Sequence, residues 1–153
     1  MKILLLGLLL LNINAFAQIA AGVDKDNGLP DAQFGSALMS FKNMKLKSED
    51  RGFKVYTRSS DKLVLEKCKA TEIVYRFYND TLFAIGITVK DMSNAKQLRD
   101  YGKKHYGPGE DGTKLNSCAW TGKKTQAVYM ESPKKTDATL SIGSKEFGPK
   151  RSK

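Results

Sequence analysis

Basic and aromatic side chains that alternate with apolar ones are the feature of this sequence best suited to binding. Arginine and lysine attract phosphates and carboxylates, and aromatic rings stack on bases or other flat groups. Their alternation along two expected strands predicts that they face away from the core, although a solvated sheet face would show the same pattern. The members of this candidate binding surface are Lys54, Tyr56, Arg58, Arg76 and Tyr78.

Residues for catalysis are scarce. His105 is the only histidine, so an acid–base pair of two histidines is excluded, and no G-x-S-x-G turn accompanies it as a serine hydrolase requires. Residues 107–114 contain glycine and a lysine, but they lack the Gly-Lys-Ser/Thr ending of a phosphate loop. Glu110 and Asp111 are adjacent carboxylates in an expected loop. The sequence therefore predicts no catalytic residue and no cofactor.

The two cysteines, Cys68 and Cys118, are candidates for one disulfide bond. In an exported protein such a pair often forms a bond, and closing a loop of this length would contribute roughly 4 kcal/mol. The alternative is two separate buried thiols that pack as small apolar groups. Two cysteines and one histidine without metal-ligand spacing predict no zinc site.

The N-terminus has the pattern of a signal peptide. Lys2 precedes an apolar run, and Ala15 and Ala17 supply the small residues of a cleavage site. We expect cleavage after Ala17 and a periplasmic or secreted protein, with an uncleaved membrane anchor as the alternative. No later stretch approaches the roughly 20 apolar residues of a membrane span, so the mature chain is expected to have no transmembrane segment.

The charge of the chain indicates the kind of partner. Lys and Arg number 26 against 16 acidic residues, which gives a formal net charge of +10. A field of this sign attracts an anionic protein, polymer or envelope surface. Nucleic acid would also be attracted, but export argues against it as the natural partner.

The first half of the chain predicts one helix and then strands. Ser36 is a suitable N-cap, and the apolar residues that follow at helical spacing predict a helix over residues 36–44. Residues 53–58 and 63–68 then read as strands, because apolar and polar residues alternate or form short apolar runs.

A hairpin over residues 71–89 is the clearest structural prediction. A two-residue turn at Asn79 and Asp80 would place the large apolar sets of its strands on opposite faces. A three-residue loop, 79–81, pairs Phe77 with Phe83 and unites six large side chains on one face. We expect this second register. The six residues are Ile73, Tyr75, Phe77, Phe83, Ile85 and Ile87.

The second half predicts a helix over residues 93–106, capped by Asp91 or Ser93 and ended by Gly107 and Pro108. The buried stripe of this helix would consist of Ala95, Leu98 and Tyr101. His105 would either extend this stripe or lie at the surface. Further strands are expected near residues 118–120, 127–130 and 138–142.

These elements predict an α+β fold with an antiparallel sheet and two helices packed on one face. Their order leaves open a degenerate repeat of a helix-then-strands unit. The expected organisation is a signal peptide over 1–17, a lead-in over 18–30, one α+β domain over 31–144 and a basic disordered tail over 145–153.

Several short motifs occur together in this chain. They are Phe34-Gly35, Tyr75-x-Phe77 with Leu82, Lys104-x-Tyr106-Gly107-Pro108, and Trp120 in a later strand. In this combination the chain resembles small secreted bacterial α+β modules of uncharacterised function. The resemblance spans roughly residues 34–142 and implies a fold, with no catalytic residues.

The sequence therefore favours an exported, non-enzymatic binding or adaptor module, which includes inhibitor and immunity proteins. It would use the basic and aromatic sheet face for binding. The alternative is a secreted hydrolase with an unrecognised carboxylate site.

Overall fold

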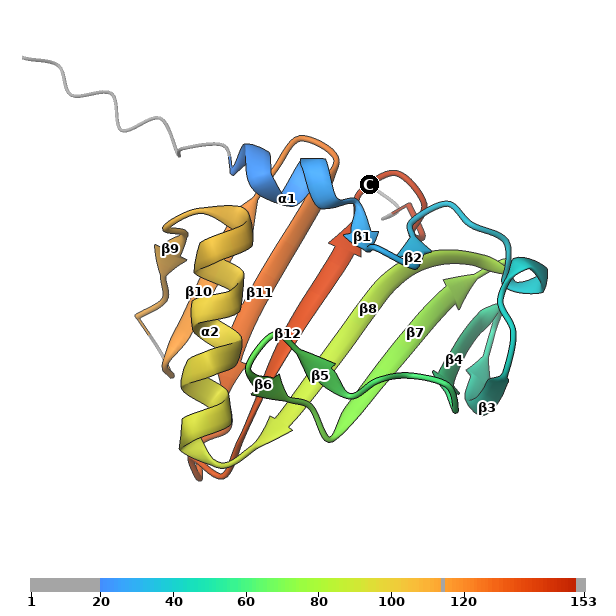
Figure 1. Ribbon diagram of the computed structural model, residues 1–153. Helices are drawn as coiled ribbons and strands as arrows, with labels where there is room; N and C mark the ends of the chain where they lie inside the picture. The colour runs from blue at the N-terminus through green and yellow to red at the C-terminus, as the bar shows by residue number, and fades with distance from the viewer. Residues whose placement is uncertain (1–19, 114, 151–153) are drawn as a thin grey trace, which may run out of the picture.

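An antiparallel sheet of eight strands forms the centre of the protein (Figure 1). The structure is a computed structural model and describes residues 20–113 and 115–150. The strand order across the sheet is β3-β4-β7-β8-β12-β11-β10-β9. The bounds are β3 Met44–Asp50, β4 Phe53–Arg58, β7 Glu72–Tyr78, β8 Thr81–Lys90, β9 Glu110–Asp111, β10 Ser117–Thr121, β11 Thr125–Glu131 and β12 Asp137–Ser144. The α+β class is confirmed, with more strand than the sequence predicted.

The sheet consists of two meanders that meet at its centre. Strands β3, β4, β7 and β8 run inward from one edge, and β9 to β12 run inward from the other edge. The last strands of the two meanders, β8 and β12, pair antiparallel from Asp137 opposite Lys90 to Gly143 opposite Ala84. The strand order of one half therefore mirrors that of the other.

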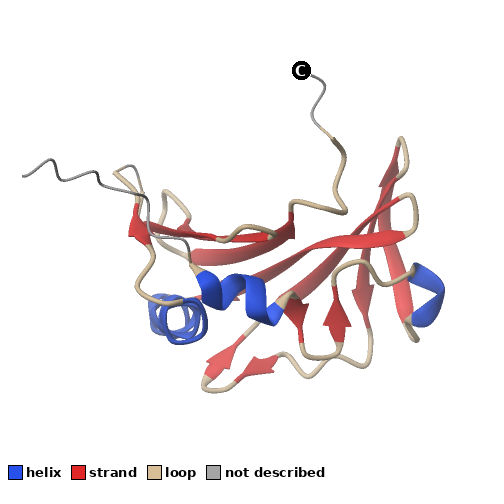
Figure 2. Cartoon of the chain, turned by 90° about the horizontal axis from the view of Figure 1, so that it is seen from above, coloured by secondary structure: helices blue, strands red, loops and turns tan. Residues whose placement is uncertain are grey.

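Two α-helices, α1 (Ala21–Asp26) and α2 (Met92–Tyr106), lie on the same side of this sheet (Figure 2). The side chain of Asp91 caps α2 by accepting a hydrogen bond from the Asn94 N–H, as expected from the sequence. Ala95 and Leu98 are fully buried against the sheet. Within the described residues, no helix has the length and apolar character needed to cross a membrane.

Short elements connect these main ones. Residues 28–33 form a tight pair of strands beside α1, and residues 64–69 form a second small hairpin beside α2 (Figure 1). Their bounds, with that of a 3-10 turn, are β1 Gly28–Leu29, β2 Ala32–Gln33, η1 Leu38–Ser40, β5 Val64–Leu65 and β6 Cys68–Lys69.

The helix predicted over residues 36–44 is wrong. Only η1 is helical there, and β3 begins at Met44. The backbone of this segment is held instead by the tip of the β7–β8 hairpin, because the Leu38 N–H donates to Asp80 O and Ser36 O accepts from the Leu82 N–H. These long-range hydrogen bonds outweigh the weak preference for a helix that four apolar residues at helical spacing provide.

The segment predicted as a lead-in, residues 18–30, contains α1 within its described part. Val23 is fully buried. Asp24 accepts hydrogen bonds of 2.7–2.9 Å from the backbone N–H groups of Lys123, Lys124 and Thr125. One carboxylate therefore ties the start of the described chain to the β10–β11 turn, about a hundred residues away.

Replacing Asp24 by alanine is expected to lower the free energy of unfolding by about 1–3 kcal/mol, the range for hydrogen bonds to a charged group. Burial opposes ionisation of Asp24, but the three backbone donors outweigh it and lower its pKa. A lowered carboxyl pKa stabilises the fold above the ordinary value of about 4, and this contribution is lost as the pH falls and Asp24 is protonated. Urea unfolding at about pH 7 and about pH 3 should show a difference between wild type and variant that shrinks in acid. A difference of equal size at both pH values would contradict this role.

The β7–β8 hairpin combines features of both registers considered for it. The loop has two residues, Asn79 and Asp80, both with positive φ, so the predicted three-residue loop is wrong. A bulge then leaves Phe83 unpaired, and beyond it Tyr75 faces Ile85 as predicted. Leu82 takes the core position expected for Phe83.

The bulge turns Phe83 to the opposite face, where its ring lies 6.0 Å from that of Phe53. Five of the six predicted core residues are therefore buried, and Phe83 is not. The five are Ile73, Tyr75, Phe77, Ile85 and Ile87.

The contact between α2 and the sheet depends on Gly102. A Cβ atom at this position would lie 2.7 Å from Cη2 of Trp120, which is too close for a normal contact. An exposed helical glycine changed to alanine gains roughly 1 kcal/mol. We expect Gly102→Ala instead to lower the free energy of unfolding by about 1–3 kcal/mol, because the core is overpacked.

Chemical denaturation of Gly102→Ala tests this, with Gly143→Ala as the control. A Cβ at Gly143 would lie 3.8 Å from its nearest neighbour, an ordinary contact, so the control should stay within about 0.5 kcal/mol of wild type. A more stable Gly102→Ala variant would show that α2 is not held this close to the sheet.

The predicted disulfide between Cys68 and Cys118 is wrong, because both residues are buried free thiols. Cys68 Sγ lies 3.7 Å from Asn94 O, near the start of α2, whereas Cys118 Sγ lies 3.7 Å from Pro108 O, just beyond its end. The 15-residue helix is roughly 22 Å long, and a disulfide needs Cα atoms within about 7 Å. The alternative of two separate buried thiols therefore describes them.

The structure describes residues 145–150 of the basic C-terminal tail that was predicted to be disordered. The Lys145 N–H donates to Lys124 O, and the Glu146 and Phe147 N–H groups donate to Ser144 Oγ. The predicted signal peptide, residues 1–17 with its cleavage after Ala17, and the last residues of the tail, 151–153, lie outside the described residues.

Candidate functional site

A groove on the helix-bearing side of the sheet is the best candidate for a functional site. Its volume is about 500 Å³, within the usual range for ligand pockets. The sheet forms its floor, the β1–β2 turn and the loop leading into β5 form its two walls, and the last turns of α2 close one end. The lining residues are Leu29, Pro30, Asp31, Arg58, Ser60, Asp61, Lys62, Val64, Leu65, Glu66, Ile73, Tyr75, Tyr101 and His105.

Apolar side chains form the middle of the groove. Leu29 and Pro30 contribute one wall, and Val64 and Leu65 contribute the other. Val64 is 56% exposed. Exposed apolar surface at the rim of a cavity is typical of a binding site.

A group of charges around the largely buried side chains of Arg58 and Asp61 forms the base of the groove at its β4 end. The Arg58 Nε–H donates to Asp61 Oδ1 at 2.6 Å, and its Nη2 donates to Asp31 Oδ2 at 2.7 Å and to the Tyr75 hydroxyl at 2.9 Å. The Tyr75 hydroxyl lies 2.9 Å from Asp61 Oδ2, to which it donates. The side chains of Arg58 and Asp61 are only 13% and 5% exposed. This arrangement fixes the guanidinium group in the sheet floor.

The phenol of Tyr75 stays protonated in this environment. Burial, together with the negative charge of Asp61, raises the pKa of Tyr75 far above its ordinary value. At the closed end of the groove, burial raises the pKa of Tyr101 to about 12. Both tyrosines therefore act as neutral hydrogen-bonding groups, and neither is suited to general base catalysis near neutral pH.

The tip of the β5–β6 hairpin is attached to the end of α2. Glu66 accepts hydrogen bonds from Lys104 Nζ at 2.9 and 3.0 Å, and its Oε1 lies 2.9 Å from His105 Nε2. The hydrogen bonds with Lys104 and His105 lower the pKa of Glu66. The other ring nitrogen of His105 lies 3.6 Å from Asp26. His105 thus links the hairpin, α2 and α1 around the groove.

The predicted binding residues do not share one face. Cross-strand neighbours in a sheet point to the same side, and Lys54 and Tyr56 pair with the buried Phe77 and Tyr75. The candidate binding surface predicted from the sequence is therefore divided between the two faces of the sheet. Lys54, Tyr56 and Arg58 lie on the helix-bearing face, while Arg76 and Tyr78 lie on the opposite one.

The division has a simple cause. Val55 lies between Lys54 and Tyr56 in β4, and its pairing with Arg76 places it on the face opposite the helices. Arg58 is the predicted residue that lines the groove. Lys54 forms an ion pair of 2.9 Å with Asp80 at the hairpin tip. These five residues therefore do not form a single surface.

Several groove residues were not predicted from the sequence. Asp61 lies between two predicted strands and was given no role, and Tyr75 was predicted only as a core residue. Their spacing from Arg58, three and 17 residues, forms no recognisable motif. The apolar run over residues 63–65 was predicted as a strand, but nothing in it indicated that the segment would form the wall of a cavity.

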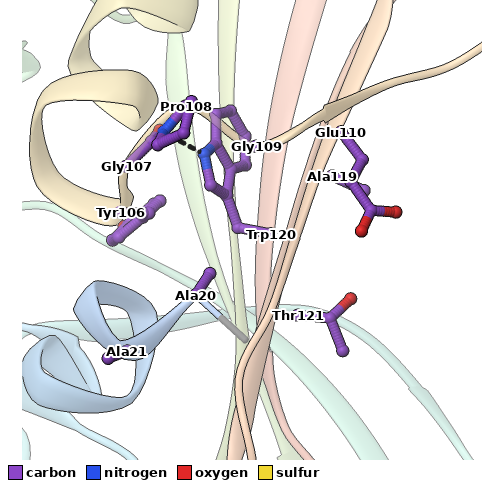
Figure 3. Close-up of a pocket in the computed structure, with 10 residues that line it drawn as sticks. All are labelled: Ala20, Ala21, Tyr106, Gly107, Pro108, Gly109, Glu110, Ala119, Trp120 and Thr121. Carbon is purple, nitrogen blue, oxygen red and sulfur yellow. Dashed lines mark hydrogen bonds between the residues drawn. The ribbon is translucent and has the colours of Figure 1, made fainter. Parts of the chain in front are cut away.

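A second cavity, of about 310 Å³, lies between α1, the end of α2 and β10 (Figure 3). The Trp120 indole donates its N–H to Gly107 O at 2.8 Å, and backbone and apolar groups form most of the remaining surface. Glu110 is its one ionisable side chain apart from the phenol of Tyr106. This cavity offers less chemistry than the groove.

The titratable groups do not assemble into a recognised reactive site. In residues 20–113 and 115–150, no three His, Cys, Asp or Glu side chains group closely enough to hold a metal ion. Each described carboxyl group with a shifted pKa has a pKa below its ordinary value, whereas a general acid needs a raised pKa. These groups are Asp24, Glu66, Asp91, Asp111 and Asp137.

Comparison with known proteins adds no further information, because no family model, curated protein or solved structure matches the chain. The resemblance to small secreted bacterial α+β modules therefore stays a prediction. The case for a function rests on the groove.

Proposed function

We propose that this protein is a non-enzymatic binding module that takes a small, largely apolar ligand into the groove. The observation that carries the proposal is a cavity of about 500 Å³ with apolar walls and a fixed polar base. Such a combination suits binding, since the walls supply affinity and a few placed polar groups supply orientation.

The exposed wall residue Val64 supports this proposal energetically. Burying apolar surface contributes roughly 25 cal/mol per Å², and Val64 is substantially exposed in the free protein. A ligand in the groove would cover this side chain. The base would need little rearrangement, because Asp61 and Tyr75 already hold Arg58 in place.

The mirrored halves of the sheet offer a reason for the position of the groove. We interpret the fold as a degenerate repeat of a helix-then-strands unit, with α2 as the helix of the second unit. The first unit has no helix of that length among its described residues, and the short hairpin β5–β6 stands over its strands instead. The groove then occupies the place that a helix would fill.

The proposal keeps export and an anionic environment as expectations. A signal peptide over residues 1–17 would deliver the protein to the periplasm or the medium. The net positive charge, +10 for the whole chain, would attract it to an anionic surface or partner, an effect that salt weakens. The groove would then bind its ligand there.

A secreted hydrolase is less well supported. Such an enzyme commonly needs two carboxyl groups with separated pKa values, one of them raised. Within the part of the chain that the structure describes, every carboxyl group with a shifted pKa has a lowered pKa. The polar base of the groove instead suits fixed hydrogen bonding.

The neutral fluorescent probe N-phenyl-1-naphthylamine tests the proposed function. Its fluorescence should increase on titration with the protein, because the probe enters an apolar environment. Val64→Asp places a charge in the wall and should weaken probe binding about tenfold or more. Met130→Asp is the matched control, since Met130 is also about half exposed but lies on β11, outside the groove.

Equal effects of the two substitutions would contradict the proposal, because the probe would then bind without regard to the groove. Failure of the wild-type protein to bind the probe would contradict it as well. Retained binding by Met130→Asp, with loss in Val64→Asp, is the expected result.

A further inference from the structure

We propose that the groove is specific for an apolar monocarboxylate, with the carboxylate at the Arg58 end and the apolar chain between the two walls. This inference rests on the proposed function and adds the chemical class of the ligand. It comes from the hydrogen-bond donors at one end of the groove.

Three side chains at this end have donors without a partner. Nη1 of Arg58 carries two N–H groups for which the described residues provide no acceptor, whereas Nε and Nη2 are both engaged. Ser60 and Lys62 also line the groove, and no side-chain hydrogen bond or ion pair joins either of them to another described residue. A ligand that accepts hydrogen bonds at this end would provide Nη1 with an acceptor.

The acidic side chains nearby leave these donors available. Asp61 accepts from Arg58 through Oδ1 and from the Tyr75 hydroxyl, and its side chain is almost fully buried. Asp31 binds only Arg58 Nη2 and is 67% exposed, so its ion pair is weak and easily exchanged. Neither carboxylate competes strongly for Nη1 or for Lys62.

The charges at the Arg58 end cancel before a ligand binds. Arg58 and Lys62 provide two positive charges there, Asp31 and Asp61 provide two negative ones, and Glu66 lies at the other end of the groove. A monoanion that accepts hydrogen bonds from a guanidinium and an ammonium group is favourable in this setting. A doubly charged phosphate would experience more repulsion from the two aspartates.

The other end of the groove sets the orientation. Glu66 lies there, and its carboxylate is already bound by Lys104 and His105. A ligand carboxylate at this end would meet Glu66, while an apolar chain would meet the ring of Tyr101 and the side chain of Leu65. The chain of the ligand therefore points toward α2 and its carboxylate points toward Arg58.

Displacement of N-phenyl-1-naphthylamine by octanoate, octan-1-ol and octylammonium, which share one apolar chain, tests this inference. At low salt and neutral pH, octanoate should displace the probe at an about tenfold lower concentration than octylammonium, and at a lower concentration than octan-1-ol. Raising NaCl to about 0.5 M should weaken octanoate and leave octan-1-ol unchanged.

Lys62→Met should remove most of the preference for octanoate over octan-1-ol, since it deletes one of the two cations. Lys62 is exposed, so this variant should fold normally. Lys90→Met is the matched control, because Lys90 is an exposed lysine at the end of β8 and does not line the groove. It should leave the preference intact.

Two results would overturn the inference. One is displacement by octan-1-ol or octylammonium at concentrations equal to or below those of octanoate. The other is a preference for octanoate that Lys62→Met and Lys90→Met reduce equally, which would indicate general attraction to a basic protein. In both cases, probe binding that still depends on Val64 would leave the proposed function standing.

Discussion

Replacing Asp61 by alanine is expected to lower the free energy of unfolding by about 3–5 kcal/mol, the range for breaking a buried ion pair by removing one partner. Asp61 accepts hydrogen bonds from Arg58 and from the Tyr75 hydroxyl, and its side chain is 5% exposed. Without it, the guanidinium group of Arg58 stays in the sheet floor with only the exposed Asp31 as a counter-ion.

Urea unfolding monitored by circular dichroism measures this effect. Asp100→Ala is the matched control, because Asp100 pairs with Lys96 on the surface of α2 and should contribute less than about 1 kcal/mol. Tyr75→Phe should give an intermediate loss of about 1–3 kcal/mol, since it leaves one oxygen of Asp61 without its donor. A loss at Asp61 as small as that at Asp100 would show that the base of the groove is not a buried ion pair.

Trp120→Ala is expected to lower the free energy of unfolding by a similar amount, about 3–5 kcal/mol, through loss of buried volume. The side chain is 1% exposed. It fills the space beside Gly102 and Gly109, and its ring lies 5.7 Å from that of Tyr106 (Figure 3). Removing the indole would leave a cavity between α2 and the sheet.

Trp120→Phe separates volume from hydrogen bonding. It keeps most of the ring but removes the indole N–H that donates to Gly107 O. We expect it to cost clearly less than the alanine variant in thermal or urea unfolding. Equal losses in the two variants would mean that the hydrogen bond, and not the packing of α2, determines the effect.

The parts of the fold that were predictable depend on local signals. Asp91 as a cap and Gly107 as a terminator define α2 within one or two residues. The alternation in β7 and β8 identified Tyr75 opposite Ile85. The bulge at Phe83 could not be predicted, because a two-residue loop plus one unpaired residue gives the same pairing as a longer loop.

Other elements depend on contacts between distant residues. Residues 36–44 have helical spacing, yet backbone hydrogen bonds to the hairpin tip at Asp80 and Leu82 hold them in another conformation. Asp24 stabilises the fold through the turn at residues 123–125. No pattern within either segment carries information about its partner.

The candidate site was predictable only in part for the same reason. Arg58 was selected for its charge in an alternating strand, but it was predicted to face away from the core and instead lies on the helix-bearing face. The groove forms where four separate segments meet, and Asp31, Asp61 and Glu66 each come from a different turn. The spacing of these residues along the sequence does not show that they meet in the folded protein.

Amide chemical-shift mapping tests the central claim, that the groove is the binding site, most directly. The uniformly ¹⁵N-labelled protein would be titrated with N-phenyl-1-naphthylamine and followed by heteronuclear spectra. We predict that the largest shifts fall on Leu29 and Asp31, on residues 60–66 and 73–75, and on Tyr101 and His105. Shifts confined to Arg76, Tyr78 and the opposite face of the sheet, or to the cavity beside Trp120, would contradict the claim.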